Sequence, residues 1–114
     1  MIYYDVIHGY IKIDNLAKSI IDTPIFQRLR HIHQTGILYL VFPASTHSRF
    51  EHSIGTYYLA NKMINNIKSN SDIYISDEII MIVSIAGLCH DLGHLMYSHL
   101  FDNMFITVDF TKSL

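Results

Sequence analysis

The clearest helical pattern along the chain covers residues 48–68. Its apolar side chains recur at steps of three and four residues, the spacing that places them on one face of a helix. The members of this stripe are Phe50, Ile54, Tyr57, Tyr58, Met63, Ile64 and Ile67. We therefore predict a long helix here and interpret the stripe as part of the protein core.

The most apolar segment, "IIMIVSIAGLC", belongs to a second predicted helix. Ser76 can cap its start, and Asp77 and Glu78 in its first turn are favoured by the helix dipole. We expect this helix to run to about Asp91. After a glycine bend, a further helix is expected over residues 95–105.

The start of the chain, "MIYYDVIHGYIKID", is rich in β-prone side chains on both sides of Gly9. Such a pattern around a glycine is typical of a short hairpin. We predict that Ile11 and Ile13 lie on the same face of it.

Two shorter elements are predicted between the hairpin and the long helix. Asn15 can cap a helix over residues 16–21, and a second helix over residues 24–33 begins with a proline, which suits a first helical turn. Gly36 is its expected stop, and residues 37–43 look extended. The predicted fold class is therefore mostly α with a small β element at the front.

Length and composition add few constraints. The chain has 114 residues, half of them hydrophobic, which is enough for one domain with a sizeable core. No apolar run reaches the roughly 18 residues that span a bilayer, and the start lacks the basic region of a signal peptide. The lone Cys89 fits a small buried side chain in a reducing compartment. We expect an intracellular protein, either cytoplasmic or nuclear.

The charge pattern gives no basic surface for duplex nucleic acid, since 8 Lys and Arg face 10 Asp and Glu. One local exception is "FQRLRHIH", which carries two arginines and two histidines. Eight histidines are many for this length. Imidazole is a common metal ligand and titrates near neutral pH, so the histidines direct attention to metal or proton chemistry.

The stretch "GLCHDLGHLMYSHLFD" holds three histidines and two aspartates in what otherwise reads as a buried helix. His90 and Asp91 are adjacent, and His94 follows His90 by about one helical turn, so the two imidazoles share a face. A single histidine on an apolar helix is more often a core residue. Burying this many polar groups is costly unless they are bound, so their density favours a functional site.

Imidazole and carboxylate together suit a divalent ion such as Fe, Mn, Zn or Mg rather than soft copper. Two ligands do not complete a site, and the best further donor is His52 in "HSRFEHSIG". Arg49 on the same predicted helix suits a phosphate, because its planar fork pairs with phosphate oxygens. The residue types therefore indicate a metal centre that faces a phosphate.

Four segments resemble, in the same order, the HD superfamily of metal-dependent phosphohydrolases: "DVIHGYIKI", "IIDTPIFQRLRHIHQTG", "VFPASTHSRFEHSIGTYYLA" and "IAGLCHDLGHLMYSHLFD". They cover roughly residues 4–105. Within the superfamily the resemblance is closest to the dNTP triphosphohydrolases, above all to the type that joins a SAM domain to its HD domain. It implies an incomplete HD-domain helical bundle behind a short β-hairpin, with residues 1–114 forming a single, C-terminally truncated HD domain.

The resemblance implies that His52, His90 and Asp91 hold the metal. The family's fourth ligand, a distant aspartate, has no match in this sequence. Asp109 lies only eighteen residues past Asp91, outside any family motif, and we do not assign it as the fourth ligand. Whether the chain is an enzyme by itself therefore stays open at this point.

The phosphate-facing residues of the family correspond to Arg49, His94 and His99. The resemblance implies that Arg49 and His99 steady the charge on the phosphates, and that His94 positions the attacking water or shuttles a proton. The alternative for His94 is a supporting role that orients His90 or Asp91.

The family's sugar-edge residues correspond to Gln34 and Thr35, although the family usually has leucine at the second position. Its allosteric guanine-nucleotide site corresponds to Asp22, Gln27 and Arg30, and this implies that GTP promotes self-association. Asp22 fits equally well as the cap of the helix that follows it. For Gln27 and Arg30 the alternative is a solvated helix face.

Three functions fit these observations. The first is metal-dependent hydrolysis of a dNTP to a deoxynucleoside and triphosphate. The second is an HD phosphohydrolase that uses the same metal site on another nucleotide. The third is a non-catalytic HD fragment that binds nucleotide or metal, or partners a full-length homologue. The unmatched fourth ligand favours the third function, whereas the intact histidine and aspartate set favours descent from an active enzyme.

Overall fold

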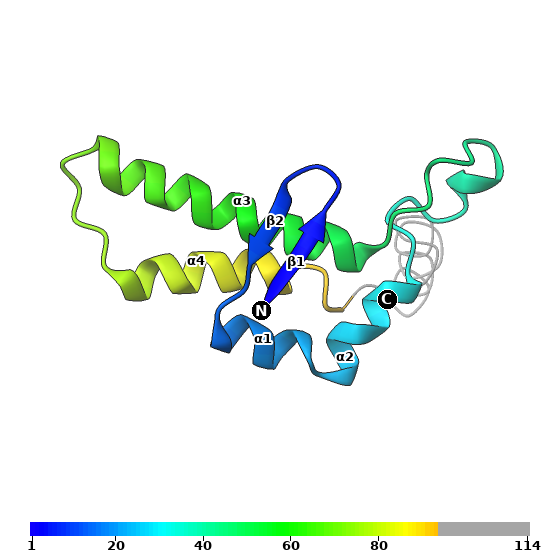
Figure 1. The fold of residues 1–114 in the computed structure, drawn as a ribbon, viewed down its shortest axis with the longest axis horizontal. Coiled ribbons are helices and arrows are strands. Elements are labelled where there is room, and N and C mark those ends of the chain that lie inside the picture. The colour runs from blue at the N-terminus through cyan, green and yellow to red at the C-terminus, as the bar shows by residue number, and fades with distance from the viewer. Residues whose placement is uncertain (94–114) are drawn as a thin grey trace, which may run out of the picture.

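The computed structural model describes residues 1–93, drawn in colour in Figure 1. Within these residues a hairpin is followed by two short helices, two 3-10 turns and two long helices. The predicted class, mostly α behind a front hairpin, is confirmed. The helix expected over residues 95–105 lies outside the described residues, as do His94 and His99. No helix in the described part is long and apolar enough to cross a bilayer.

The hairpin consists of β1 (Ile2–Asp5) and β2 (Gly9–Lys12), paired antiparallel. Gly9 has a φ of 76°, a left-handed conformation that glycine adopts without strain. The last side chain of β1 accepts hydrogen bonds from two backbone N–H groups of the connecting turn, at 3.1 and 2.9 Å. Ile11 and Ile13 are both buried, as predicted, so one face of the hairpin belongs to the core.

Helix α1 (Asn15–Ile21) begins one residue earlier than expected. Its cap is Asp14, whose carboxylate accepts a hydrogen bond from the Ala17 N–H at 2.8 Å, and the prediction of Asn15 as the cap is wrong. The other oxygen of Asp14 accepts a hydrogen bond from the Tyr57 hydroxyl at 3.1 Å. The carboxylate therefore serves two donors, one local and one from a distant helix.

Helix α2 (Pro24–Gln27) starts at the proline, as predicted, but tightens into the 3-10 turn η1 (Arg28–His31) instead of continuing to residue 33. Its cap is Thr23, whose hydroxyl accepts a hydrogen bond from the Phe26 N–H at 3.4 Å. Asp22 does not cap α2 and instead ends α1, so that interpretation of Asp22 is wrong. The proline fixes where α2 begins, because the residue before a proline avoids the helical conformation.

The segment 37–43 is not extended, contrary to the prediction. It contains the 3-10 turn η2 (Leu38–Leu40), and it closes on itself through N–H groups of Leu38 and Val41 that donate to the carbonyls of Thr35 and Leu38, at 3.2 and 3.0 Å. An isolated strand would leave its backbone groups without partners in a sheet. Local turns satisfy these groups instead.

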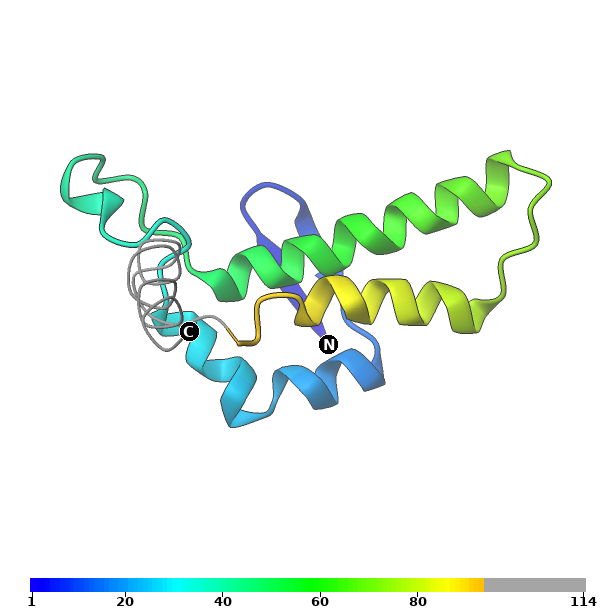
Figure 2. The same ribbon diagram turned by 180° about the vertical axis from the view of Figure 1, so that it is seen from behind.

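The two long helices are α3 (Arg49–Asn70) and α4 (Asp77–Cys89). Ser48 caps α3 in a capping box, in which its hydroxyl accepts from the Glu51 N–H and the Glu51 carboxylate accepts from the Ser48 N–H. Ser76 caps α4, as predicted. Figures 1 and 2 show the two helices side by side and antiparallel, joined by a loop at their far end.

Gly87 lets α4 approach α3 closely. A Cβ atom at this position would lie 3.1 Å from the Thr56 carbonyl oxygen and 3.3 Å from the Ala60 Cβ. Such distances are tighter than ordinary contacts, so the absence of a side chain at Gly87 sets the spacing of the helices. This close approach lies one turn before the residues that end α4.

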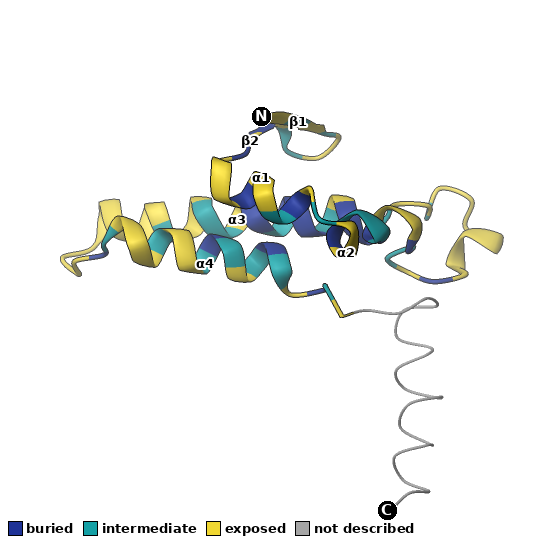
Figure 3. Cartoon of the chain, turned by 90° about the horizontal axis from the view of Figure 1, so that it is seen from below, coloured by how far each residue is buried: buried dark blue, intermediate teal, exposed yellow. Residues whose placement is uncertain are grey.

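The core gathers the inner face of the hairpin, α1, α2 with η1, the first half of α3 and the end of α4. Its buried members are Ile11, Ile13, Ala17, Ile21, Phe26, Leu29, Ile32, Phe50, Ile54, Tyr57 and Leu88. Figure 3 shows this burial beside the largely exposed far ends of α3 and α4. The predicted apolar stripe is therefore only partly core, because Met63 is 58% and Ile67 41% exposed.

Candidate metal centre

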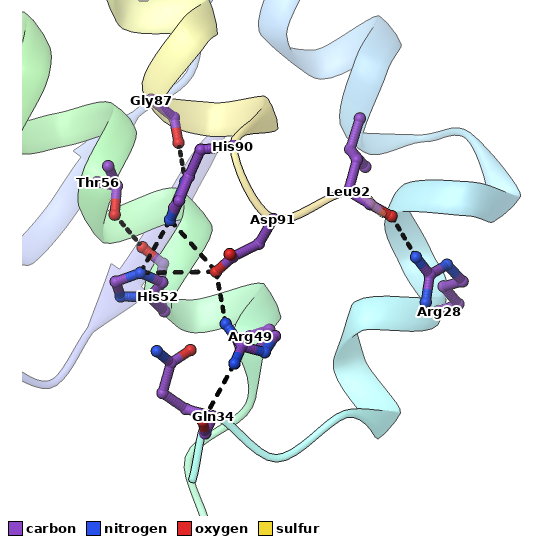
Figure 4. Close-up of polar contacts among 9 residues, drawn as sticks. All are labelled: Arg28, Gln34, Arg49, His52, Thr56, Gly87, His90, Asp91 and Leu92. Carbon is purple, nitrogen blue, oxygen red and sulfur yellow. Dashed lines mark hydrogen bonds and ion pairs between the residues drawn. The ribbon is translucent and has the colours of Figure 1, made fainter. Parts of the chain in front are cut away.

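Three side chains with metal-ligating chemistry meet where the start of α3 lies against the end of α4 (Figure 4). His52 lies in the first turn of α3, His90 caps the end of α4, and Asp91 follows directly. The capping box fixes the start of α3, and the contact at Gly87 fixes how near the end of α4 comes to it. Two ordinary features of helix structure therefore bring these side chains together.

The ligating atoms lie at mutual distances that one ion could bridge. His52 Nε2 is 3.1 Å from His90 Nε2 and 3.6 Å from Asp91 Oδ2, and His90 Nε2 is 3.2 Å from Asp91 Oδ2. Two ligand atoms about 2.1 Å from one ion are about 3.0 Å apart at a right angle and about 3.4 Å at the tetrahedral angle. The spacing and the donor chemistry both fit one divalent ion.

The tautomer of His90 is set by its backbone neighbour. Its Nδ1 lies 2.7 Å from the Gly87 carbonyl oxygen, which only accepts hydrogen bonds, so Nδ1 carries the proton. In the neutral ring Nε2 then presents its lone pair to His52 and Asp91. A histidine held by one nitrogen and ligating through the other is the usual arrangement at metal sites.

The electrostatic surroundings of His52 also favour a neutral ring that can bind a metal. Burial lowers the pKa of His52 below its ordinary value of 6.5, and the nearby His90 and Arg49 act in the same direction, while Asp91 opposes them. A lowered pKa keeps the ring neutral near pH 7, and only the neutral ring offers a lone pair to a metal.

Arg49 is buried, with 1% of its surface exposed, and points at the centre from the first residue of α3. Its Nη1 donates to Asp91 Oδ2 at 2.9 Å, and its Nη2 donates to the Gln34 carbonyl at 3.4 Å. A buried charge is stable only with a partner, and here each partner compensates the other. Arg49 therefore orients the Asp91 carboxylate, a role that the residue type alone did not reveal.

A known family matches the part of the chain that holds this centre. Residues 49–113, which include all three converging side chains, match the HD domain. The chain belongs to the HD domain family. The resemblance identified from the four sequence segments is confirmed.

Several curated proteins are similar over most of this HD chain. It is 52% identical over 106 residues to deoxynucleoside triphosphate triphosphohydrolase SAMHD1 of Danio rerio, covering 92% of this chain and 17% of that protein. The Homo sapiens protein of the same name is 50% identical over 103 residues, covering 90% and 16%. A putative HD domain-containing protein of Acanthamoeba polyphaga mimivirus, L394, is 45% identical over 114 residues, covering 89% and 25%. The chain thus spans between about a sixth and a quarter of these relatives.

Of the predicted sugar-edge residues of the HD domain, Gln34 lies beside the centre. Its carbonyl accepts from Arg49, and its N–H donates to the His47 carbonyl at 3.0 Å, which ties it to the loop before α3. Thr35 follows it and is exposed. Gln34 is therefore connected to Asp91 through Arg49, and the sugar-edge role of Gln34 and Thr35 remains a prediction.

The predicted effector residues are close in the fold but differ in their contacts. Gln27 donates through Nε2 to the Ile21 carbonyl at 2.8 Å and accepts through Oε1 from Arg30 Nε at 2.7 Å. The Arg30 guanidinium lies 3.7 Å from the centre of the Phe50 ring. Asp22 is exposed at the end of α1. Gln27 and Arg30 are thus held in place rather than merely solvated, and nucleotide binding here remains a prediction.

One contact near the centre was missed by sequence reasoning. Arg28 Nη2 donates a hydrogen bond to the carbonyl oxygen of Leu92, the residue after Asp91 (Figure 4). The only signal in the sequence was the basic run that contains Arg28, and a run of charges does not show which backbone group it meets.

A groove opens beside the centre. It has a volume of about 430 Å³ and lies between the turn of the hairpin, the loop before α3 and the first turns of α3, with His8, His47 and His52 among its lining residues. His52 therefore faces this groove as well as His90 and Asp91, and the groove gives water or a small molecule a path to it.

Proposed function

We propose that this chain carries the metal-binding part of an HD-type phosphohydrolase site that converts a dNTP to a deoxynucleoside and triphosphate. The observation that carries the proposal is the convergence of His52, His90 and Asp91 on one point, with Arg49 against Asp91. The substrate class is supported by relatives at about half identity whose names give deoxynucleoside triphosphate triphosphohydrolase activity.

The donor set suits Fe, Mn, Zn or Mg. A divalent ion, when bound, neutralises phosphate oxygens and lowers the pKa of a bound water, so that a nucleophile exists near neutral pH. In this proposal His52, His90 and Asp91 would hold the ion. The Gly87 carbonyl keeps His90 in the tautomer that this role needs.

The other site residues act on the nucleotide. Arg49 keeps Asp91 in place through Nη1, and in this proposal its positive charge steadies the phosphates. His99 steadies charge on the phosphates in this proposal, and His94 positions the attacking water or moves a proton. The sugar of the nucleotide contacts Gln34 and the neighbouring Thr35 in this proposal.

The test is metal analysis of the purified chain together with an assay for triphosphate release. We expect one divalent ion per chain, and no bound ion after His90→Ala and Asp91→Ala are combined. His31→Ala, at an exposed histidine on η1, is the matched control and should keep the metal. Equal metal content in the double variant would contradict the ligand assignment. A panel of nucleotides shows whether a dNTP, another nucleotide or none is hydrolysed.

A guanine-nucleotide effector is also part of the proposal, read by Asp22, Gln27 and Arg30. It is supported by the hydrogen bond that joins Gln27 and Arg30. GTP is expected to raise the sedimentation coefficient of the chain through self-association, and Arg30→Ala should remove this response. The same sedimentation with and without GTP would exclude the effector role for this chain.

A further inference from the structure

Arg28 connects the front of the chain to the segment that carries the metal ligands. It is the first residue of η1, and its guanidinium donates to the carbonyl of Leu92, a residue 64 positions later in the chain. Leu92 directly follows Asp91, so the contact acts on the backbone beside a proposed ligand. Figure 4 shows Arg28 reaching this carbonyl on the side of Asp91 away from His52 and His90.

We propose that Arg28 is a positioning residue for the metal centre: by holding the Leu92 carbonyl, it fixes the backbone that aims Asp91 Oδ2 at His52 and His90. The inference rests on the metal centre of the proposed function. It assigns to Arg28 no contact with metal or nucleotide.

The segment that carries Asp91 needs such support because it lies past the end of a helix. Helix α4 ends at Cys89, and the Leu92 N–H donates back to the Cys89 carbonyl at 3.2 Å. Carbonyls in the last turn of a helix and just beyond it lack partners within the helix. Arg28 supplies a donor to one of them, so the turn is held from outside α4.

The residues that flank Arg28 are packed in the core. Phe26 and Leu29, on either side of it in α2 and η1, are both fully buried at 0% exposure. The backbone of Arg28 is therefore anchored in the core. The segment at Asp91 is consequently held at two points, at the Asp91 side chain by Arg49 and at the carbonyl of the next residue by Arg28.

Removal of Arg28 should change cation binding in opposite directions, depending on whether Arg28 acts through its charge or through its hydrogen bond to Leu92. If Arg28 acted only through its positive charge, removing it would tighten the binding of a cation. If it acts by position, removing it loosens Asp91 and weakens binding. The loss of partners that orient metal ligands typically costs roughly 10-fold to 100-fold in metal affinity.

The experiment is titration of the 114-residue chain with Mn²⁺, followed by calorimetry, well below the unfolding midpoint of every variant. Arg28→Met keeps the apolar stem but loses the donors and the charge, and we expect its dissociation constant to rise about 10-fold. Arg28→Lys keeps the charge and a donor and should restore most of the affinity. Lys18→Ala removes the same unit of charge from an exposed position on α1 and should change nothing.

A second measurement applies to the chain without metal. In NMR spectra, Arg28→Met should shift the carbonyl carbon of Leu92 and speed amide exchange at Gly93, while Lys18→Ala leaves both unchanged. Unchanged signals at Leu92 and Gly93 would overturn the inference, and so would equal or tighter Mn²⁺ binding by Arg28→Met. A wild-type chain that binds no Mn²⁺ while Arg28→Met still shifts these signals would instead overturn the metal centre and leave Arg28 as the support of this turn.

Discussion

At the scale of single residues, His52 links the stability of the fold to pH. Burial lowers the pKa of His52 from 6.5 in the folded chain, whereas the unfolded chain has the ordinary value. At pH values between the folded and the unfolded pKa of His52, the unfolded chain binds more protons than the folded chain. The free energy of unfolding therefore falls as the pH drops through about 6.5, and it levels off below the folded pKa.

We expect His52→Gln to flatten this part of the pH profile, because glutamine does not titrate. The measurement is urea unfolding at several pH values between about 5 and 7.5 in metal-free buffer. His31→Gln makes the same change at an exposed position and should keep the slope. An unchanged slope in His52→Gln would show that its burial has no such effect.

Arg49 and Asp91 form the most buried ion pair of the described residues, with 1% and 8% of their surfaces exposed. Arg49→Met should lower the free energy of unfolding by about 3 kcal/mol or more, because it leaves a carboxylate buried without its cation. Asp91→Leu should cost a similar amount. The variant with both changes should be more stable than either single variant, since two apolar side chains can replace a buried pair.

A double-mutant cycle by urea unfolding measures this coupling. The cycle contradicts the structure if the two losses simply add. Arg49→Met should also weaken metal binding, because Asp91 loses the group that orients it. An effect on nucleotide alone, as expected for a residue that touches only phosphate, would show that the ion pair does not position the ligand.

At the scale of elements, Gly87 decides how the two long helices meet. Alanine in place of glycine normally stabilises a helix by about 1 kcal/mol. Here the added methyl would press on the Thr56 carbonyl and on Ala60, at 3.1 and 3.3 Å. We expect Gly87→Ala to lower the melting temperature and to weaken metal binding, because it moves His90 away from α3.

The matched control is Gly93→Ala, which adds the same methyl where no atom lies within 4 Å. Thermal unfolding followed by circular dichroism compares the two variants. A Gly87→Ala chain as stable as the Gly93→Ala chain would mean that α3 and α4 can separate slightly at no cost.

Local sequence signals predicted helix starts and turns well, because these features depend on neighbouring residues. The proline, the serine cap and the glycine turn of the hairpin each act within a few residues, and Pro24, Ser76 and Gly9 did what was expected. The cap of α1 was misplaced by one residue because Asp14 and Asn15 have similar capping chemistry. Residues 37–43 were wrongly expected to be extended because β-prone composition does not show whether a partner strand exists.

The sequence predicted the candidate metal-binding side chains but not the contacts that hold them in place. Residue type and the family motifs indicated His52, His90 and Asp91. The pairing of Arg49 with Asp91 joins positions 42 apart, and that of Arg28 with Leu92 joins positions 64 apart. Contacts of this length depend on how the helices pack, which no local pattern encodes.

At the scale of the whole molecule, the 114-residue chain alone should release little or no triphosphate from a dNTP. The family's fourth carboxylate ligand has no counterpart in this sequence, so the ion should be held loosely. A displacement of about 1 Å can cost roughly 100-fold in rate. Steady triphosphate release that is lost in His90→Ala would prove this expectation wrong, and Asp102 and Asp109 would then be the first candidates for the completing ligand.

Apolar side chains on the far ends of the long helices point to a second property of the whole chain. Met63, Met81 and Ile82 are 58%, 39% and 58% exposed. Exposed apolar surface of this kind promotes association. We expect the chain to aggregate as its concentration rises, and light scattering at several concentrations measures this. Met63→Lys should reduce the scattering, while Lys68→Met on the same helix should increase it.

The two arginine contacts that hold Asp91 also determine when the centre can form. The hairpin and the capped helices involve neighbours in sequence, so they can form while the chain is still being synthesised. Closing a loop of 42 or 64 residues costs entropy before the contact offsets it, so such contacts form late. Metal uptake would then follow folding instead of starting it, and a bound ion would mark a chain whose first 92 residues have already come together.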